Sequence, residues 1–146
     1  MSAFFEWAGE RYTLKAEDLV EALDIESNSP ILDAVRIHGL SQANHSVYVV
    51  ELDTEVLKQY LFRQANPAYS SGKPCVYVGL TGLEVEKRFE NHKRGYQSNY
   101  FASRYGMRLL YSLFQELNPR RYEIAHATEF ELGRKLRIEG YGVWQN

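Results

Sequence analysis

Two short runs of β-branched and aromatic residues stand out in the middle of the chain. Residues 46–53 read SVYVVELD, and residues 76–78 read VYV inside the segment 73–95. Runs of this length and composition, bounded by turn residues, are typical of strands. The apolar segment 108–114, RLLYSLF, is expected to be a third strand or another buried segment.

Helical patterns follow both of these strands. After the first, Asp53 and Thr54 open a helical pattern through TEVLKQYLF, and the polar, turn-rich residues 65–73 predict a loop. After the second, Thr81 and Glu84 fit a capping box, so a helix is expected to begin near Gly82. Side chains four apart mark two faces of this helix. Val85 and Phe89 form an apolar face, and Glu84, Arg88 and His92 form a polar stripe beside it.

A last helix is expected over residues 128–137, after a break at Pro119, and two glutamates in it compete for a functional role. Glu131 is explained by structure alone, because it can pair with Lys135 and complete a capping box from Thr128. Glu129 instead shares a face with Leu132, Gly133 and Leu136. A carboxylate on an apolar face is costly unless it is paired or bound to a cation. Glu129 is therefore the preferred metal ligand, with Glu131 as the alternative.

The first forty-five residues have a different pattern. Residues 13–24 and 30–39 each predict a helix, the second beginning at a proline and ending at a glycine. We expect residues 1–45 to form a mostly helical extension packed on the core, serving either substrate recognition or as a lid. Residues 46–146 are expected to form the main domain, an α+β fold with a small antiparallel or mixed sheet flanked by helices.

Composition narrows the class of protein. The chain has 146 residues, 45% apolar and 25% charged, which are globular averages and argue against general disorder. No apolar run approaches membrane-spanning length, and the N-terminus carries acids where a signal peptide would be basic. We therefore expect a cytoplasmic protein with no membrane partner. The single cysteine, Cys75, lies in an apolar strand and is expected to be a packing residue.

Charge is unevenly distributed along the chain. The net charge is −2, but residues 1–72 carry −6 and residues 73–146 carry +4. A basic half indicates a surface for a polyanion such as DNA. The segment 95–105, GYQSNYFASRY, adds aromatic residues that either contact DNA or pack in a small core. The side chains expected to contact nucleic acid are Lys87, Lys93, Arg94 and Arg104.

The tripeptides at the two strands, together with three later residues, resemble the GIY-YIG nucleases. Residues 46–48 read SVY and residues 77–79 read YVG. Arg88 follows Tyr77 by eleven residues, His92 follows by four more, and a glutamate stands on a late helix. The first tripeptide departs from the family pattern at Ser46 and Val47, and the second only at Val78. The resemblance covers residues 46–146.

This resemblance implies a metal-dependent endonuclease that hydrolyses DNA phosphodiester bonds. It implies that the two tripeptide strands pair, and that one glutamate, here Glu129, holds one divalent metal, Mg or Mn. Arg88 would bind phosphate oxygens. The remaining implied site residues are Tyr48 as the leading general base, Tyr77 to position water, His92 as an auxiliary base or orienting group, and the terminal Asn146 as a supporting asparagine.

To act as a general base, Tyr48 needs a lowered pKa. The ordinary pKa of a tyrosine is about 10, so a phenolate near pH 7 needs a pKa lower by about 3, or roughly 4 kcal/mol. Arg88 and a nearby metal are the features that could supply this, and His92 titrates closer to neutrality. Two other functions stay open. One is a catalytically inactive module on the same fold that binds nucleic acid or a partner, and the other is an α+β interaction protein whose tyrosines are core.

Overall fold

The computed structural model describes residues 43–146 in full and residues 4–7 and 10–13 by their backbone. A four-stranded sheet, in the order β5-β3-β4-β6, lies at the centre of the larger part. β3 is antiparallel to β4 and β5, and β6 is parallel to β4. The predicted α+β fold with a small mixed sheet is confirmed. The strands are β3 (Ser46–Leu52), β4 (Cys75–Thr81), β5 (Gly106–Leu109) and β6 (Gly142–Trp144).

The two central strands are buried on both faces, which explains why each reads as a nearly continuous apolar run. Their register places Tyr48 opposite Gly79 and Tyr77 opposite Val50. Because side chains alternate along a strand, both tyrosines project from the same side, which we call the tyrosine face. The opposite side, which we call the valine face, carries Val47, Val49, Val76 and Val78.

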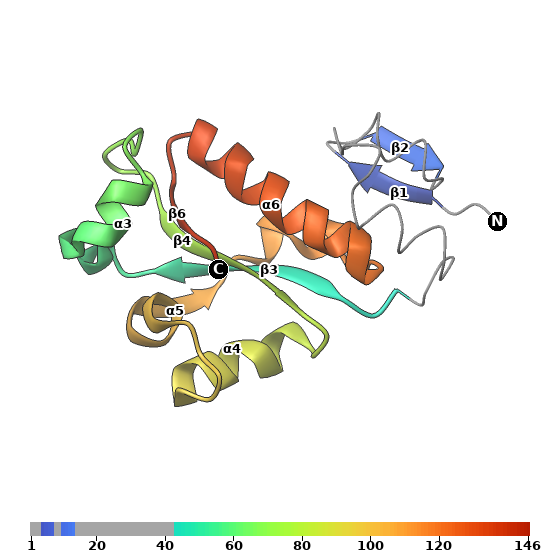
Figure 1. Ribbon diagram of the computed structural model, residues 1–146, viewed down its shortest axis with the longest axis horizontal. Helices are drawn as coiled ribbons and strands as arrows, with labels where there is room; N and C mark the ends of the chain where they lie inside the picture. Colours follow the sequence, from blue (N-terminus) through green and yellow to red (C-terminus); the bar gives the residue numbers. More distant parts are fainter. Residues whose placement is uncertain (1–3, 8–9, 14–42) are drawn as a thin grey trace.

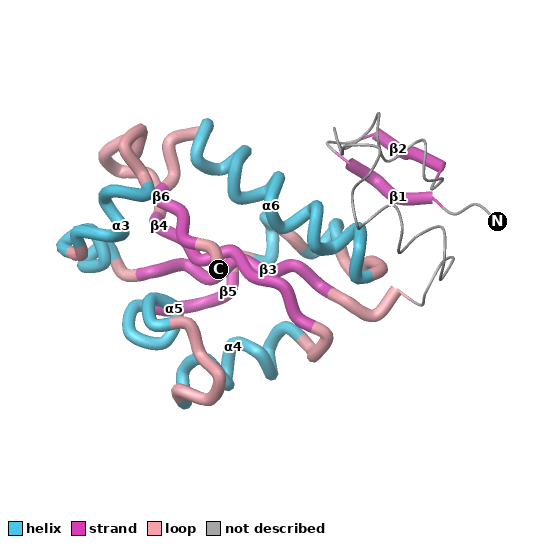
Figure 2. Tube along the Cα trace, viewed as in Figure 1, coloured by secondary structure: helices cyan, strands magenta, loops and turns pink. Residues whose placement is uncertain are grey.

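Helices cover both faces of the sheet (Figure 1). α6 (Tyr122–Ile138) lies on the valine side, and α4 (Val85–Arg94) and α5 (Tyr100–Tyr105) lie on the tyrosine side. α3 (Tyr60–Ala65) packs against β6 and the 3-10 helix η1 (Thr54–Lys58). Figure 2 shows the strands running through the middle of these helices. No helix in the described part of the chain combines the length and apolar character needed to cross a membrane.

Two asparagines replace missing strand partners. Asn66, at the end of α3, exchanges hydrogen bonds with the backbone of Val143 in the short edge strand β6, at 2.7 and 3.0 Å. Asn118 does the same for Val47 in β3, at 2.9 and 2.6 Å. Buried backbone groups need such partners. The first of these contacts fixes the edge strand that leads to the C-terminus, and thereby places the last residues of the chain.

Two predicted elements differ from the structure in where they begin or end. The helix after β4 begins at Val85 rather than near Gly82, because the Thr81 hydroxyl accepts from the backbone N–H of Leu83 and forms a turn instead of a capping box. The predicted segment 108–114 is a strand only to Leu109, after which come the 3-10 helices η2 (Tyr111–Leu113) and η3 (Gln115–Leu117). Asn118 occupies the pairing position on β3 that a longer strand would take.

Other predictions are confirmed. Asp53 caps η1 by accepting from the N–H of Glu55, and residues 66–74 form the loop before β4. Val85 and Phe89 pack against the core. Cys75 is buried, and burial raises the pKa of its thiol, as expected for a packing residue.

The N-terminal region is described only in part. β1 (Phe4–Trp7) and β2 (Glu10–Thr13) form an antiparallel hairpin in a region expected to be mostly helical. The helices expected over 13–24 and 30–39 lie outside the described residues, apart from position 13. The recognition or lid role of this extension stays a prediction.

Candidate active site

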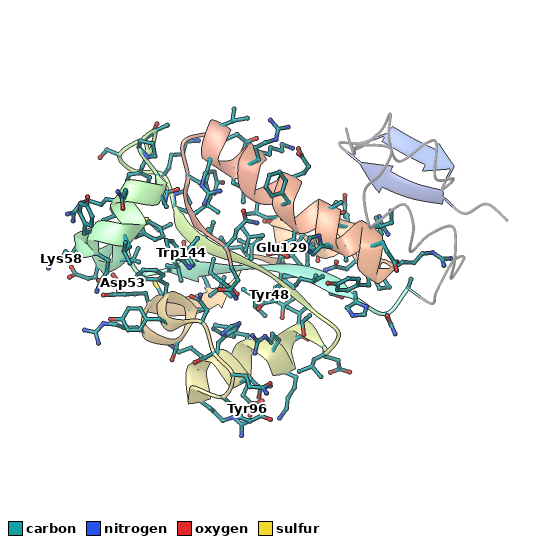
Figure 3. All side chains as sticks on the ribbon, in the orientation of Figure 1. Tyr48, Asp53, Lys58, Tyr96, Glu129 and Trp144 are labelled. Atoms are coloured by element: carbon teal, nitrogen blue, oxygen red, sulfur yellow. The ribbon has the colours of Figure 1, made fainter. Side chains whose placement is uncertain are left out.

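The two tyrosines lie side by side on the tyrosine face. Their ring centroids are 6.0 Å apart, the spacing of diagonal neighbours on paired strands. Gly79 makes room for this arrangement, because a Cβ at that position would lie 2.5 Å from the Cζ and hydroxyl oxygen of Tyr48. The tyrosine-x-glycine pattern of β4 therefore has a steric reason. Tyr48 lies near the centre of the view in Figure 3, where Glu129 is also labelled.

His92 joins this pair from α4. Its side chain is fully buried, and its Nε2 lies 2.7 Å from the Tyr48 hydroxyl. The backbone N–H of Asn99 donates to its Nδ1 at 3.1 Å. Because Nδ1 is an acceptor, we assign the proton of the neutral ring to Nε2, which then donates to the Tyr48 oxygen. This histidine is thus not part of a solvated stripe, and in this geometry it is a donor to the tyrosine rather than its proton acceptor.

The C-terminus closes the cluster from another direction. The side-chain amide of Asn146 donates to the Tyr77 hydroxyl at 2.9 Å, and its oxygen accepts from the amide of Asn99 at 2.8 Å. Asn99 also caps α5, since its side-chain oxygen accepts from the N–H groups of Phe101 and Ala102. Asn99 therefore joins His92 to Asn146 and to the first turn of α5.

Arg88 and Glu129 complete the set, and both are half-buried. Arg88 lies one turn before His92 on α4 and acts electrostatically on Tyr48, Tyr77 and His92. Glu129 comes from α6 and acts electrostatically on Tyr77. The adjacent Gln145 donates to the backbone oxygen of Glu129 at 2.7 Å, which ties α6 to the C-terminal residues of the cluster.

Burial governs the electrostatics of the tyrosines. Burial, and next the charge of Tyr77, raise the pKa of Tyr48, while the charge and hydrogen bonding of Arg88 lower it without overcoming the burial. The pKa of Tyr77 is raised too, by burial first and also by Glu129, against the lowering effects of Tyr48 and Arg88. In the protein alone the pKa of Tyr48 is therefore raised, not lowered as the base role requires, because desolvation of a phenolate outweighs one nearby guanidinium.

The other two titratable groups are shifted as well. Burial, followed by the charge of Arg88, lowers the pKa of His92 to about 4. Burial raises the pKa of Glu129 to about 7. The histidine is thus neutral at pH 7, and the carboxylate is poised between its charged and neutral forms. Perturbed groups gathered in one place are typical of functional sites.

The two glutamates of α6 have different surroundings. Glu131 forms an ion pair with Arg134 at 2.7 Å, not with Lys135 as expected. Its capping role is also wrong, because α6 begins at Tyr122 and the Thr128 hydroxyl donates to the backbone oxygen of Ile124. Among the described residues, no cation forms an ion pair with the Glu129 carboxylate. Because Glu131 has an ion-pair partner and Glu129 has none among the described residues, Glu129 remains the predicted metal ligand.

The cluster offers few protein ligands for a metal ion. The described residues contain no group of three or more His, Cys, Asp or Glu side chains that could hold a metal ion. A metal here would therefore have Glu129 as its carboxylate ligand and would take the rest from water and phosphate oxygens. Mg²⁺ is commonly bound in this way, through one or two carboxylates plus substrate phosphates.

The cations expected to contact DNA are not equally available. Lys87 is exposed. The ammonium of Lys93 donates to the backbone oxygens of Ser103 and Gly106 at 3.0 and 2.8 Å, so it ties α4 to the segment around β5. The other two bind close neighbours: Arg94 donates to Asn91 at 2.8 Å, and Arg104 donates to the hydroxyl of Tyr105 at 3.2 Å.

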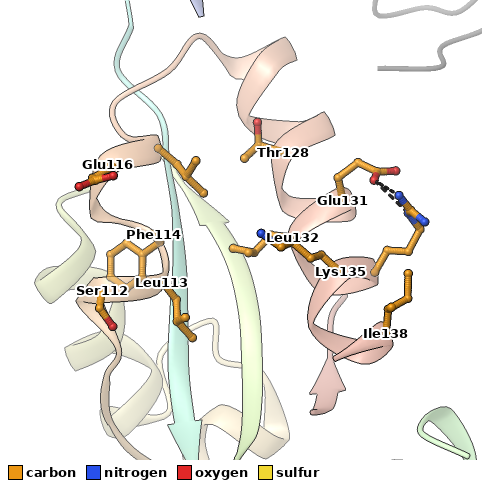
Figure 4. A pocket seen from close by; sticks show the side chains of 11 residues that line it. Ser112, Leu113, Phe114, Glu116, Thr128, Glu131, Leu132, Lys135 and Ile138 are labelled. Carbon is orange, nitrogen blue, oxygen red and sulfur yellow. Dashed lines mark hydrogen bonds and ion pairs between the residues drawn. The ribbon is translucent and has the colours of Figure 1, made fainter. Parts of the chain in front are cut away.

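Two hollows on the surface lie away from this cluster. One, of about 350 Å³, lies between residues 112–117 and α6 (Figure 4). The other, of about 620 Å³, is bordered by Asp53, Arg104 and their neighbours. Since Tyr48 and His92 are 0% exposed, a substrate would meet the cluster first at the half-buried Arg88 and Glu129.

Sequence reasoning missed Asn99 and Gln145. An asparagine directly before a helical segment is a helix-start signal, and it could have revealed α5. No local signal marks Gln145, whose partner is sixteen residues away. No protein-family model matches this chain, and no curated protein or solved structure matches it either.

Proposed function

We propose that this chain is a metal-dependent endonuclease that hydrolyses DNA phosphodiester bonds through a GIY-YIG-type site and acts in the cytoplasm. The observation that carries the proposal is a cluster of polar side chains from separate elements around Tyr48 and Tyr77. Two strands, two helices and the C-terminus each contribute a polar side chain to it. The members are Tyr48, Tyr77, Arg88, His92, Glu129 and Asn146.

Tyr48 is the proposed general base. The Nε2–H of His92 donates to its oxygen, which stabilises the phenolate that a base must become. The Asn99 N–H holds His92 in the tautomer needed for this donation. Burial alone keeps Tyr48 protonated, so ionisation depends on positive charge brought to the cluster. Tyr77, held by Asn146, is proposed to orient the attacking water.

Arg88 is the proposed phosphate ligand, because a planar guanidinium matches two phosphate oxygens and stabilises the charge that develops on them. Glu129 would hold the cation. When bound, a divalent cation would polarise the phosphate, stabilise the leaving oxygen and act with Arg88 to lower the pKa of Tyr48. A cation held by the carboxylate near Tyr77 and the guanidinium near Tyr48 would thus bring two positive charges to one phosphate.

One observation favours the second candidate, a catalytically inactive binding module. Tyr48 is 0% exposed and its pKa is raised, which suits a buried structural network as well as a resting active site. The departures of the first tripeptide at Ser46 and Val47 point the same way. This candidate predicts DNA binding or partner binding without hydrolysis.

Supercoiled plasmid incubated with the purified protein distinguishes the two candidates. The assay is run with Mg²⁺, with Mn²⁺ and with excess chelator, and the same samples are examined by gel shift in chelator at several salt concentrations. Metal-dependent nicking that chelator abolishes supports the endonuclease. A salt-sensitive shift with no nicking in either metal supports the binding module. The absence of both nicking and a shift contradicts the endonuclease and a DNA-binding module, and favours a module that binds a protein partner or the interaction protein with core tyrosines.

A further inference from the structure

Two tyrosine rings between the end of α4 and the start of α5 are exposed. Tyr96 and Tyr100 are each 57% exposed, whereas Phe101 in the same segment is buried. Tyr96 lies in a turn between two left-handed residues, Gly95 and Gln97. Tyr100 opens α5 and rests on the ring of Phe101 at 5.4 Å. In the aromatic segment 95–105, Phe101 therefore lies in the core, Tyr105 packs partly buried against it, and Tyr96 and Tyr100 lie on the surface.

Tyr100 is connected directly to the catalytic cluster. Its neighbour Asn99 donates through its backbone to His92 and through its side chain to Asn146, which in turn donates to the Tyr77 hydroxyl. The position of the Tyr100 backbone is thus fixed relative to the site. Tyr96 is fixed through the end of α4, because its N–H donates to the backbone oxygen of Asn91 at 2.9 Å.

The stretch of sequence that carries these rings is basic. Residues 87–108 contain six Lys or Arg and a single acid, Glu90. Arg104 lies one helical turn after Tyr100 and interacts with it electrostatically. Exposed aromatic rings combined with cations are the elements of single-strand binding, in which bases stack on the rings and cations follow the backbone.

From these observations we infer that Tyr96 and Tyr100 form a stacking surface for unpaired bases next to the scissile phosphate. The inference rests on the proposed function and names its substrate class, which is DNA with single-stranded or unpaired nucleotides near the cleavage site. Bases in an intact duplex are stacked on each other and do not present a face to a protein ring. A duplex would therefore use the cations of this surface but not its rings.

Binding measured without cleavage tests this inference. Fluorescence anisotropy in chelator, at one fixed salt concentration, compares a labelled single strand with the matching blunt duplex. The variants are Tyr96→Ala and Tyr100→Ala, each with its Tyr→Phe counterpart, which keeps the ring. Tyr60→Ala is the matched control, because Tyr60 is 65% exposed on α3, outside this surface.

The expected result is tighter binding of the single strand by the wild type and a Kd at least about fivefold weaker for each alanine variant. The Phe variants and Tyr60→Ala should bind like the wild type, and duplex binding should change less than about twofold. Equal losses for single strand and duplex, or unchanged single-strand binding, would overturn the inference. The plasmid assay separates the two failures, since metal-dependent nicking with unchanged binding in these variants leaves the proposed function standing.

Discussion

The two faces of β3 and β4 differ in their chemistry. On the valine face, Val47, Val49, Val76 and Val78 pack under α6. On the tyrosine face, the intervening positions carry Tyr48 and Tyr77, which meet His92 and Asn146 through hydrogen bonds. Both faces are equally buried, so burial alone does not distinguish core from site.

The difference lies in how buried groups are satisfied. A valine needs only close packing, and an apolar side chain of similar size fills its place at modest cost. Each polar group of the tyrosine face depends on a particular partner: His92 depends on Asn99, and Tyr77 depends on Asn146. Such networks are costly unless every member is satisfied. The tyrosine face is thus the one where a conservative substitution should change activity more than stability.

The largest effect is expected for Tyr48→Phe. Loss of the proposed base should reduce metal-dependent cleavage by roughly 10³-fold. The hydroxyl also accepts from His92, so its removal leaves a buried donor unpaired and should cost about 1 kcal/mol of stability. Plasmid cleavage rates and urea unfolding of the same preparation measure both quantities. Cleavage within a few fold of wild type would remove Tyr48 from the mechanism.

Adjacent residues on opposite faces allow a matched comparison. Gly79→Ala places a Cβ against the Tyr48 ring and should lower the free energy of unfolding by about 3 kcal/mol while displacing that ring. Val78→Ala, on the valine face, should cost about 2 kcal/mol through a cavity. Urea unfolding checks the stabilities. Only the glycine variant should lose cleavage per folded molecule, and equal losses in both would contradict the division into two faces.

The buried histidine predicts a dependence of stability on pH. The folded-state pKa of His92 is about 4, below its ordinary value, so between these values the unfolded chain binds a proton that the folded chain does not. Wild-type stability should therefore fall by about 2 kcal/mol as pH drops from roughly 7 to 4.5 because of this group. His92→Gln keeps an amide donor and acceptor and should lose that contribution. The exposed His126→Gln is the control, and a slope shared by His92→Gln and wild type would contradict the burial.

The smallest effect concerns Glu129. Its folded-state pKa of about 7 lies above the ordinary value, so stability falls as pH rises through the window between them. Glu129→Gln removes this cost and should be more stable than wild type at about pH 8 by about 1 kcal/mol, after allowance for solvent screening of a half-buried group. At about pH 5 the difference should vanish. Glu131→Gln, which breaks the ion pair with Arg134, should show no such gain, and thermal unfolding at both pH values distinguishes the variants.

Local sequence patterns predicted many elements of the fold. The composition of β3 and β4 predicted both strands, and the four-residue spacing of Arg88 and His92 placed both on one helix. The turn at Thr81 delayed α4, because a short-range hydrogen bond to Leu83 competes with a capping box. The three residues of β6 are too few to give a pattern, and a side chain from α3 holds them in place.

The sequence predicted most residues of the candidate site but not the hydrogen bonds that join them. Tyr48, Tyr77, Arg88, His92 and Glu129 all carried sequence signals. The hydrogen bonds that join them to Asn99 and Asn146 did not, since Asn146 lies 69 residues from Tyr77 along the chain. Nor could the sequence give the direction of the Tyr48 pKa, because this depends on how fully the folded chain removes the hydroxyl from water.

Arg88 provides the most direct test of the central claim that the tyrosine face is a nuclease site. It is half-buried on α4, and alanine there removes the proposed phosphate ligand while keeping the tyrosines and His92 in the sequence. The measurement is the rate of plasmid nicking in Mg²⁺ or Mn²⁺ for wild type, Arg88→Ala and the neighbouring exposed Lys87→Ala, with unfolding curves to establish that each is folded. We predict normal folding and at least about 100-fold slower cleavage for Arg88→Ala, and less than about tenfold slower cleavage for Lys87→Ala. Unchanged cleavage by folded Arg88→Ala would contradict the account.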